Sequence, residues 1–152
     1  MNLQPYLEFA TSLAYHAGKI TLRYFNTGIV PDRKENNDPV TIADREAEAF
    51  VRSQVEKHYP GHAIVGEEYG EQGTGHSFRW IVDPIDGTIS FVQGVPLYGV
   101  LIALEIDGVV QVGAAYFPPL DEMLTAGSGL GCWWNGRRAR VSGVSKLSEA
   151  CV

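Results

Sequence analysis

The 152-residue sequence has only two cysteines, Cys132 and Cys151, and their separation matches no zinc-binding or redox motif. Two isolated thiols exclude a disulfide-stapled secreted scaffold and favour the reducing cytoplasm. The first residues, MNLQPYLEFA, lack the basic segment and apolar core of a secretory signal. No run reaches the roughly 18 apolar residues of a membrane span, so we expect no membrane partner.

Basic residues are also scarce. The chain has 12 Lys and Arg against 18 Asp and Glu, and a formal net charge of -6 at pH 7. Nucleic-acid backbones are bound mainly by Lys and Arg, so we expect no nucleic-acid partner. An acidic protein can still bind phosphate if it first binds cations. A hydrophobic fraction of 45% and a charged fraction of 20% are typical of one globular domain with a real core.

The first third of the chain has helical periodicity. A first amphipathic helix is predicted over residues 2–26, and a polar, proline-containing loop follows it. A second helix is predicted from about Thr41 until Pro60-Gly61 stops it. Its apolar face is formed by Ala43, Ala47, Phe50, Val51 and Val55.

The periodicity then changes to that of strands. Asp107-Gly108 and Asn135-Gly136 are strong signals for hairpin turns. Strands are predicted within residues 62–68, 78–84, 98–106, 109–117 and 131–142, and PPLDEM (residues 118–123) is predicted to turn into another short strand. Two helices followed by mostly antiparallel strands predict an α+β domain in which the helix pair covers one face of the sheet.

Acidic residues gather at the ends of several of these elements. Three clusters stand out: Asp38, Thr41 and Asp44 in NDPVTIAD, Glu67 and Glu68 in VGEEYGE, and Asp83 and Asp86 in VDPIDGT. The last two clusters each follow a predicted strand. If those strands are neighbours, Glu67, Asp83 and Asp86 crowd into one place.

Crowded carboxylates raise each other's pKa, and a divalent cation removes that penalty. Oxygen ligands favour Mg²⁺, Ca²⁺ or Mn²⁺. Asp83 is the natural bridging ligand, with Glu67 and Asp86 each completing a different metal shell. Two metals about 3.5–4 Å apart would suit in-line attack on a phosphate ester.

The residues after Asp86 suit the same chemistry. Gly87 permits close backbone approach, and Thr88 is predicted to cap a short helix whose free N–H groups face a phosphate oxygen. The Thr88 hydroxyl is also placed to hold a water against the metal. The chain would thus bind a dianion despite its negative charge.

Each cluster taken alone has a simpler interpretation. Asp83-Pro84 and Asp86-Gly87 are common turn formers, GEEYGEQ resembles a solvated acidic loop, and DPVT resembles a helix cap. The four histidines have no ligand spacing, Trp133-Trp134 suits sheet packing, and the arginines of GRRAR suit a solvated hairpin. The conjunction of the three acidic clusters favours the cation site.

These motifs resemble a known family. WIVDPIDGTISFVQGVP (residues 80–96) resembles the first signature of the inositol monophosphatase family, and DPVTIADREAE, GEEYGEQ and GCWWNGRRARVS are similar to its other motifs, in the same order. The resemblance implies the N-terminal half of a layered αβαβα fold and Mg²⁺-dependent hydrolysis of phosphate monoesters, with two or three Mg²⁺ ions per site.

The resemblance also implies residue roles. Glu67, Asp83 and the Ile85 carbonyl would ligate one metal, and Asp83 and Asp86 a second. Asp38 and Thr88 would act with Glu67 on the attacking water, and the amides of Gly87 and Thr88 would bind phosphate. Glu68 would be a supporting residue near the metals.

Two departures from the family pattern bear on the substrate and on completeness. Ile89-Ser90-Phe91 replaces the usual Thr-Asn-Phe, and Ser90 is more like histidinol-phosphatase members, although Ile89 stands where those commonly have a basic residue. Family members are nearly twice as long, and no Trp-Asp pair completes the second metal site here.

We therefore expect residues 1–152 to be the N-terminal metal-binding domain of a phosphatase whose C-terminal domain is absent. The expected substrate is a small phosphorylated metabolite: histidinol phosphate first, then inositol monophosphate, then a nucleotide 3′-phosphate. A homodimer is expected at full length. The alternative is a truncated, non-catalytic domain that binds cations or docks to a partner.

Overall fold

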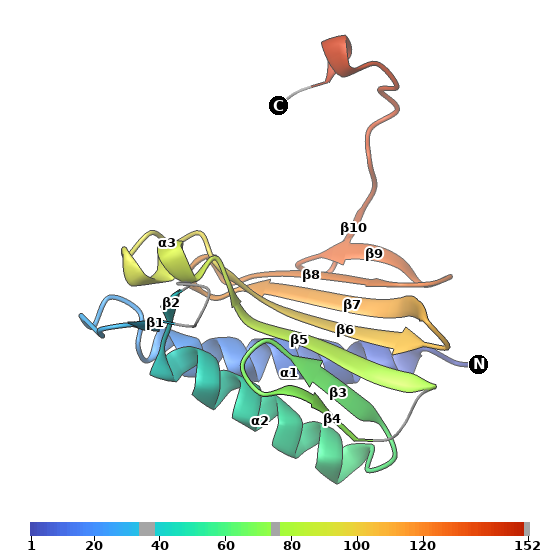
Figure 1. Ribbon diagram of the computed structural model, residues 1–152. Coiled ribbons are helices and arrows are strands. Elements are labelled where there is room, and N and C mark those ends of the chain that lie inside the picture. Colours follow the sequence, from blue (N-terminus) through green and yellow to red (C-terminus); the bar gives the residue numbers. More distant parts are fainter. Residues whose placement is uncertain (34–38, 74–76, 151–152) are drawn as a thin grey trace.

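The computed structural model describes residues 1–33, 39–73 and 77–150. Two long helices lie side by side across one face of an eight-stranded sheet, as the α+β prediction required (Figure 1). None of the helices within the described ranges combines the length and apolar composition that crossing a bilayer requires.

Helix α1 spans Gln4–Leu22 and is shorter than the predicted residues 2–26. Pro5 in the first turn suits the helix start, because an amide there has no partner inside the helix. At the other end the chain turns at Asn26, which has a positive φ of 58°. The buried residues of α1 recur at helical spacing, and they are Leu7, Ala10, Leu13, Ala14, Ala17, Gly18 and Thr21.

Helix α2 spans Ile42–His58, as predicted. Its capping box is complete: the Thr41 hydroxyl accepts a hydrogen bond from the Ala43 N–H, and the Asp44 carboxylate accepts one from the Thr41 N–H. Such a cap contributes about 1 kcal/mol of stability. The predicted apolar face is confirmed, with Ala43, Ala47, Val51 and Val55 buried and Phe50 partly buried against the core.

The main sheet has the strand order β10-β9-β8-β7-β6-β5-β3-β4. Every neighbouring pair is antiparallel except β3 and β5, which are parallel. Its strands are β3 Ala63–Gly66, β4 Gly70–Gln72, β5 Phe78–Asp86, β6 Gly99–Ile106, β7 Val109–Phe117, β8 Glu122–Gly127, β9 Gly131–Trp134 and β10 Arg137–Ala139.

Short elements fill the connections. The predicted loop after α1 contains a two-residue strand pair, β1 Asp32–Arg33 with β2 Pro39–Val40. The others are α3 Thr88–Val92 and the 3₁₀ turns η1 Pro118–Leu120 and η2 Leu147–Glu149. Both predicted hairpin turns are confirmed: Asp107-Gly108 and Asn135-Gly136 have positive φ at both positions, as a type I′ turn requires.

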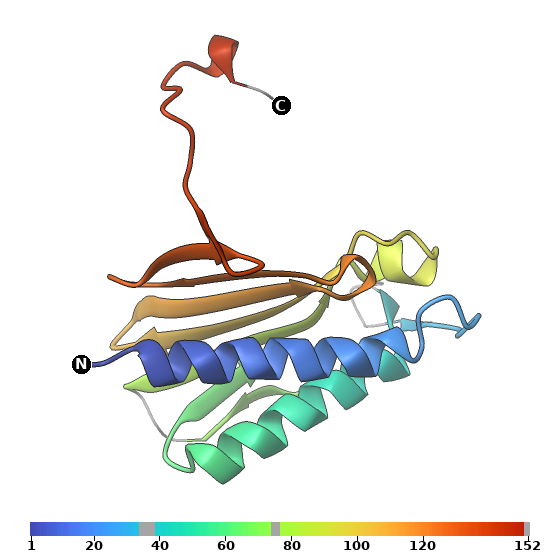
Figure 2. The same ribbon diagram turned by 180° about the vertical axis from the view of Figure 1, so that it is seen from behind.

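The core lies between the helix pair and the sheet (Figure 2). Trp80 and Leu104 are completely buried there, and Val51 of α2 packs into the same cluster. Burying one such large apolar side chain contributes about 1.5–3 kcal/mol. This packing fixes the direction of β5, and hence the position of the acidic residues at its end.

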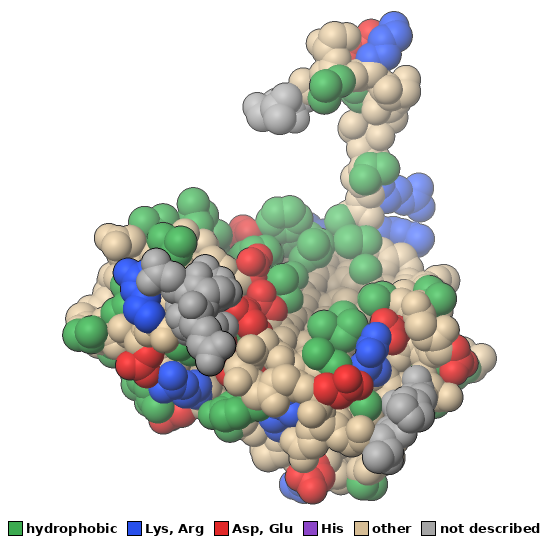
Figure 3. Space-filling model, viewed as in Figure 1, with side chains coloured by type: hydrophobic (Ala, Val, Ile, Leu, Met, Phe, Trp, Pro, Cys, Tyr) green, Lys and Arg blue, Asp and Glu red, His purple; other side chains and the backbone are tan. Residues whose placement is uncertain are grey.

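The opposite face of the sheet is uncovered within the described residues (Figure 3). It holds a hollow of about 520 Å³ whose lining is almost entirely apolar and includes Ile81, Leu101, Ala103, Ala115 and Leu124, with Asp83 at its border. A solvated sheet face normally carries polar residues, and the lining of this hollow does not, although Arg79 and Glu105 form an ion pair farther along the same face.

The segment after β10 leaves the body of the molecule (Figures 1 and 2). Val141 is 96% exposed and Leu147 is 86% exposed, although both are apolar. Like the uncovered sheet face, this segment presents hydrophobic surface to solvent.

Candidate functional site

The site begins where two parallel strands end side by side. Strand β3 pairs with β5 in the register Gly66↔Val82. Because the strands are parallel, the residues that follow, Glu67 and Asp83, emerge at the same end of the sheet. The two strands are therefore neighbours, which was the condition for Glu67, Asp83 and Asp86 to lie close together.

The Asp83 carboxyl group is the most unusual feature of this end. Its Oδ1 atom is buried and has no hydrogen-bond partner among the described residues. Burial, the charges of Glu67 and Asp86 and a side-chain hydrogen bond with Glu67 together raise the pKa of Asp83 to about 7, with burial the largest cause. Burial and like charges act in the same sense because both disfavour the carboxylate form.

The two aspartates of VDPID are held by an irregular strand, whereas the sequence had suggested a turn around Pro84. Strand β5 continues through the buried Pro84 and Ile85 to Asp86. Its register against β6 shifts between Asp83↔Leu101 and Asp86↔Gly99, so β5 carries one extra residue there. Such a bulge bends a strand and redirects its side chains. It allows Asp83 and Asp86, three residues apart, to act on the same place.

Gly87 has a stricter role than close approach. Its φ is 93°, in the left-handed region, and a Cβ there would lie 3.1 Å from the Leu97 carbonyl oxygen. Gly87 is also the N-cap of α3, so the prediction that Thr88 is the N-cap is wrong. Thr88 is the first helical residue, and its hydroxyl donates to the Ile85 carbonyl oxygen at 3.0 Å.

The Thr41–Asp44 pair bears out the simpler interpretation of its cluster, a helix cap. The Asp44 Oδ2 accepts hydrogen bonds from the Thr41 N–H at 2.7 Å and from the Thr41 hydroxyl at 2.6 Å. Asp44 is only 2% exposed. Its pKa is raised to about 6, mainly by burial and also by the charge of Glu68, although the bonds from Thr41 oppose the rise. Asp38, the third member of this cluster, lies outside the described residues.

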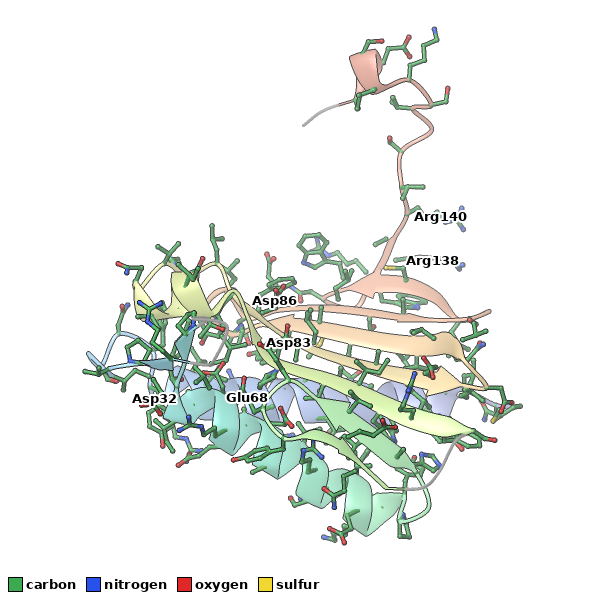
Figure 4. All side chains as sticks on the ribbon, viewed as in Figure 1. Asp32, Glu68, Asp83, Asp86, Arg138 and Arg140 are labelled. Carbon is green, nitrogen blue, oxygen red and sulfur yellow. The ribbon has the colours of Figure 1, made fainter. Side chains whose placement is uncertain are left out.

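The turn after β3 therefore carries two glutamates that interact with different neighbours. The charge of Glu67 raises the pKa of Asp83, whereas the charge of Glu68 raises the pKa of Asp44. Figure 4 shows Asp83 and Asp86 where β5 leads into α3 and Glu68 below them beside α2, with Asp32 of β1 farther out. Carboxylates from α2, the β3–β4 turn and β5 thus gather at one end of the molecule.

Sequence reasoning missed one buried acid behind this turn. Glu48 of α2 is completely buried and accepts hydrogen bonds from the backbone amides of Glu68 and Tyr69. The only sequence signal was its position on the apolar side of α2, four residues before Arg52.

The donors at this end suit a hard cation in kind. They are oxygens, they carry like charges, and one of them, Asp83 Oδ1, is buried without a partner. Across the part of the chain that the structure describes, no group of three or more His, Cys, Asp or Glu side chains is already arranged to hold a metal ion. The residues therefore fit a divalent ion by chemistry and charge, and binding would require the carboxylates to close around it.

The other singled-out side chains follow their simpler interpretations. Arg138 and Arg140 are exposed and lie away from the acidic end, with Arg138 over the Trp133 ring (Figure 4). The His62 Nδ1 accepts a hydrogen bond from the Trp80 indole and its ring stacks on Phe78. These groups contribute packing, and none reaches the carboxylates in the described contacts.

Comparison with known proteins places the whole chain. The model of the inositol monophosphatase family matches residues 2–152. A histidinol-phosphatase of Chlorobaculum parvum is 44% identical over 151 residues, which are 99% of this chain and 58% of that protein. The Nus factor SuhB of Escherichia coli is 37% identical over 148 residues, which are 95% of this chain and 55% of that protein.

Solved structures agree with these matches. The suhB protein of Bartonella henselae superimposes with a TM-score of 0.85 at 36% identity, covering 93% of this chain and 56% of that one. An inositol monophosphatase from Anabaena gives 0.84 at 37% identity, covering 97% and 54%. The chain thus spans slightly more than half the length of the relatives it matches. The continuous match and the shared fold show that this chain belongs to the inositol monophosphatase family.

Proposed function

We propose that the chain provides the cation-binding part of a Mg²⁺-dependent phosphate monoesterase. One observation carries the proposal: the buried, unpartnered Oδ1 of Asp83, in a carboxyl group whose pKa is raised by burial, Glu67 and Asp86. A carboxylate kept in so unfavourable a place is expected where a ligand compensates for it.

Under this proposal Glu67, Asp83, Asp86 and the Ile85 carbonyl oxygen hold two or three Mg²⁺ ions. Bound there, Mg²⁺ would neutralise phosphate charge and lower the pKa of a water molecule. The bulge in β5 supports this assignment, because it brings Asp83 and Asp86 to one end of the strand with the Ile85 carbonyl between them.

The chain's own residues would bind and orient the phosphate. The amides of Gly87 and Thr88 lie at the start of α3, where backbone N–H groups suit an anion. The Thr88 hydroxyl would position the attacking water together with Glu67 and Asp38. In the present structure that hydroxyl donates to the Ile85 carbonyl, so it is held on the side of the predicted ligands.

We further propose that residues 1–152 are one half of the catalytic unit. Two observations support this: the relatives extend well beyond the matched region, and the sheet face beside Asp83 is an apolar hollow without a covering layer in the described residues. A second segment packed there would exclude water from the carboxylates and add ligands to the second metal site.

Histidinol phosphate is the favoured substrate of the complete protein, followed by inositol monophosphate and then a nucleotide 3′-phosphate. Ser90 and the 44% identity to a protein named histidinol-phosphatase support this order. We also propose a cytoplasmic location and a homodimer for the complete protein.

The test is a phosphatase assay with these three monoesters, with and without Mg²⁺. It is run on the 152-residue chain and on a fusion of this chain to the part of the Chlorobaculum parvum relative that follows the match. We expect Mg²⁺-dependent release of phosphate from the fusion, fastest with histidinol phosphate. No turnover of any monoester by the fusion would reject the enzymatic role, and full activity of the 152-residue chain alone would reject the two-half proposal.

A second function is supported by one comparison. The Escherichia coli relative is named a Nus factor, and this name does not mention hydrolysis. A non-catalytic docking role would use the uncovered sheet face and leave the carboxylates dispensable. Retention of partner binding by a variant with Asp83→Asn, together with loss through Ala103→Glu in the apolar hollow, would favour this function.

A further inference from the structure

The turn that carries Glu67 and Glu68 is hydrogen-bonded through its backbone to the buried carboxylate of Glu48. Glu48 lies in α2, is 0% exposed, and has no part in the proposed chemistry. Its Oε2 accepts a hydrogen bond from the Glu68 N–H at 2.7 Å, and its Oε1 accepts one from the Tyr69 N–H at 3.1 Å. Two consecutive amides of the turn are therefore fixed to one side chain.

Arg52 completes this arrangement one helical turn later. Its Nε donates to Glu48 Oε1 at 2.8 Å, and its Nη2 lies 2.8 Å from the same oxygen. Arg52 also donates to the Gly70 carbonyl oxygen and to the Gln72 side chain. The pair thus fixes the whole connection from Glu68 to β4 against α2.

The strand before the turn is shaped to admit Glu48. A Cβ on Gly66 would lie 2.0 Å from Glu48 Oε1 and 2.2 Å from its carboxyl carbon. Atoms that are not bonded to each other do not approach so closely, so the Glu48 carboxylate can occupy this place only because residue 66 has no side chain. Gly66 is also the last residue of β3, directly before Glu67.

Stability alone is a poor explanation for this arrangement. Burying a charged pair costs about as much desolvation free energy as its attraction returns, and apolar residues of similar size often serve a fold equally well. An apolar pair cannot accept hydrogen bonds from two successive amides. What the carboxylate adds is a fixed backbone direction at the point where Glu67 and Glu68 leave it.

That direction controls where Glu67 lies relative to Asp83. Glu67 follows Gly66, which pairs in parallel with Val82, so it leaves the sheet at the same end as Asp83 of β5. A rotation of the turn would move Glu67 away from Asp83 although neither carboxylate had changed.

We propose that Glu48 is a positioning residue for the cation site: by binding the amides of Glu68 and Tyr69, it holds Glu67 beside Asp83. The inference rests on the proposed function in so far as that site takes a divalent ion. Groups that orient the ligands of a metal typically change its affinity about 10- to 100-fold.

The test measures Mn²⁺ binding to the metal-free 152-residue chain by electron paramagnetic resonance of the free ion. Glu48→Gln keeps the size of the side chain but presents an NH₂ group to one of the bound amides. We expect it to weaken Mn²⁺ binding 10- to 100-fold with the number of sites unchanged. Glu46→Gln, which removes a charge from the same helix and contacts Arg23 instead, is the matched control and should bind Mn²⁺ like the unmodified chain.

A second readout separates positioning from a loss of folded protein. Partial unfolding would lower the number of Mn²⁺ sites and leave the affinity of the remainder unchanged, and that result would overturn the proposal. Amide hydrogen exchange should accelerate at Glu68 and Tyr69 in Glu48→Gln while the amides of β6 stay protected. Gly66→Ala, which displaces the Glu48 carboxylate without altering its charge, should weaken Mn²⁺ binding in the same way.

The outcomes also separate this inference from the proposed function. If the unmodified chain binds no Mn²⁺, or if Asp83→Asn binds it equally well, the cation site itself is rejected. If the unmodified chain binds Mn²⁺ through Asp83 and Glu48→Gln binds it with equal affinity, only the positioning role is rejected.

Discussion

Glu48, which is completely buried, and Asp83, which is partly buried with a fully buried Oδ1, lie at the same end of the molecule in opposite surroundings. The Glu48 carboxylate has a guanidinium partner and two backbone donors. Asp83 has an oxygen without a hydrogen-bond partner among the described residues, and its nearest charges are those of Glu67 and Asp86. Within the described residues, the Glu48 carboxylate therefore has compensating partners for its charge, and the Asp83 carboxylate does not.

The difference separates a structural role from a binding role. Compensating donors make a buried charge a rigid part of the structure, and removing one partner of such a pair is costly. A buried acid crowded by like charges reduces stability, and it is expected where a ligand repays that cost. Substitutions at the two positions should therefore have opposite effects on stability, and both should weaken metal binding, Asp83→Asn more strongly.

The largest expected effect is that of Asp83→Asn on metal binding. The substitution removes the proposed bridging charge, so Mn²⁺ affinity should fall by more than about 100-fold, beyond what loss of an orienting group causes. Turnover by the fusion should fall by several orders of magnitude. The free energy of unfolding in metal-free buffer should stay the same or rise, because an uncompensated charge has been removed.

This prediction is checked by urea denaturation in EDTA alongside Mn²⁺ titration of the same preparations. Asp121→Asn is a suitable control, since Asp121 is exposed and is paired with Lys19 and Tyr116 far along the chain. Near-normal Mn²⁺ binding by Asp83→Asn would remove the distinction drawn between the two acids.

The next largest effect concerns stability at Glu48. Glu48→Ala leaves Arg52 and the amides of Glu68 and Tyr69 without their acceptor, so the free energy of unfolding should fall by about 3–5 kcal/mol. The double substitution with Arg52→Ala should cost less than the sum of the two single ones, by at least about 0.5 kcal/mol. Urea denaturation of the four proteins measures this, and strict additivity would show that the two side chains do not act as a unit.

A smaller effect is expected in the pH dependence of stability, through Asp44. Its pKa is about 6 in the folded chain and about 3.9 in an unfolded one, so the folded state favours the protonated acid. The contribution of Asp44 to the free energy of unfolding is fully present below about pH 4. It falls by roughly 3 kcal/mol in all as the pH rises through 6.

Asp44→Asn should remove that loss. The free energy of unfolding of the unmodified chain should therefore decline more steeply than that of the variant between about pH 4 and pH 8 in EDTA. The difference between the two curves isolates Asp44 from Asp83, which titrates in both proteins. Parallel curves would mean that the bonds from Thr41 outweigh burial at this site.

The sequence predicted most of the elements correctly because their signals are local. Helical periodicity predicted α1 and α2, the DPVT segment predicted the cap, and Asp107-Gly108 and Asn135-Gly136 predicted the hairpins. Boundaries were less accurate: α1 ends at Leu22, and β5 runs through Pro84 to Asp86. A proline is accepted in a strand at a bulge, and a bulge depends on the partner strand as well as on its own residues.

The candidate site divides in the same way. The sequence alone showed which residues carry carboxylates and that they follow strand-like runs. That Glu67 and Asp83 meet required β3 and β5 to be adjacent and parallel, and sequence alone left that adjacency as a condition. The N-cap of α3 was misassigned to Thr88 because a left-handed glycine N-cap has no side-chain signal.

By itself the sequence determined the residue types, the periodicities and the motifs that identify the family, because each is a property of neighbouring positions. Only the tertiary structure decided which acids are compensated. Glu48 and Asp83 are both acidic residues between apolar neighbours in the sequence. In the fold, Glu48 is surrounded by Arg52, Gly66 and the amides of the β3–β4 turn. Asp83 is instead close to the charges of Glu67 and Asp86. The free energy of a buried charge depends on the groups that folding brings around it, and those groups lie on other elements of the chain.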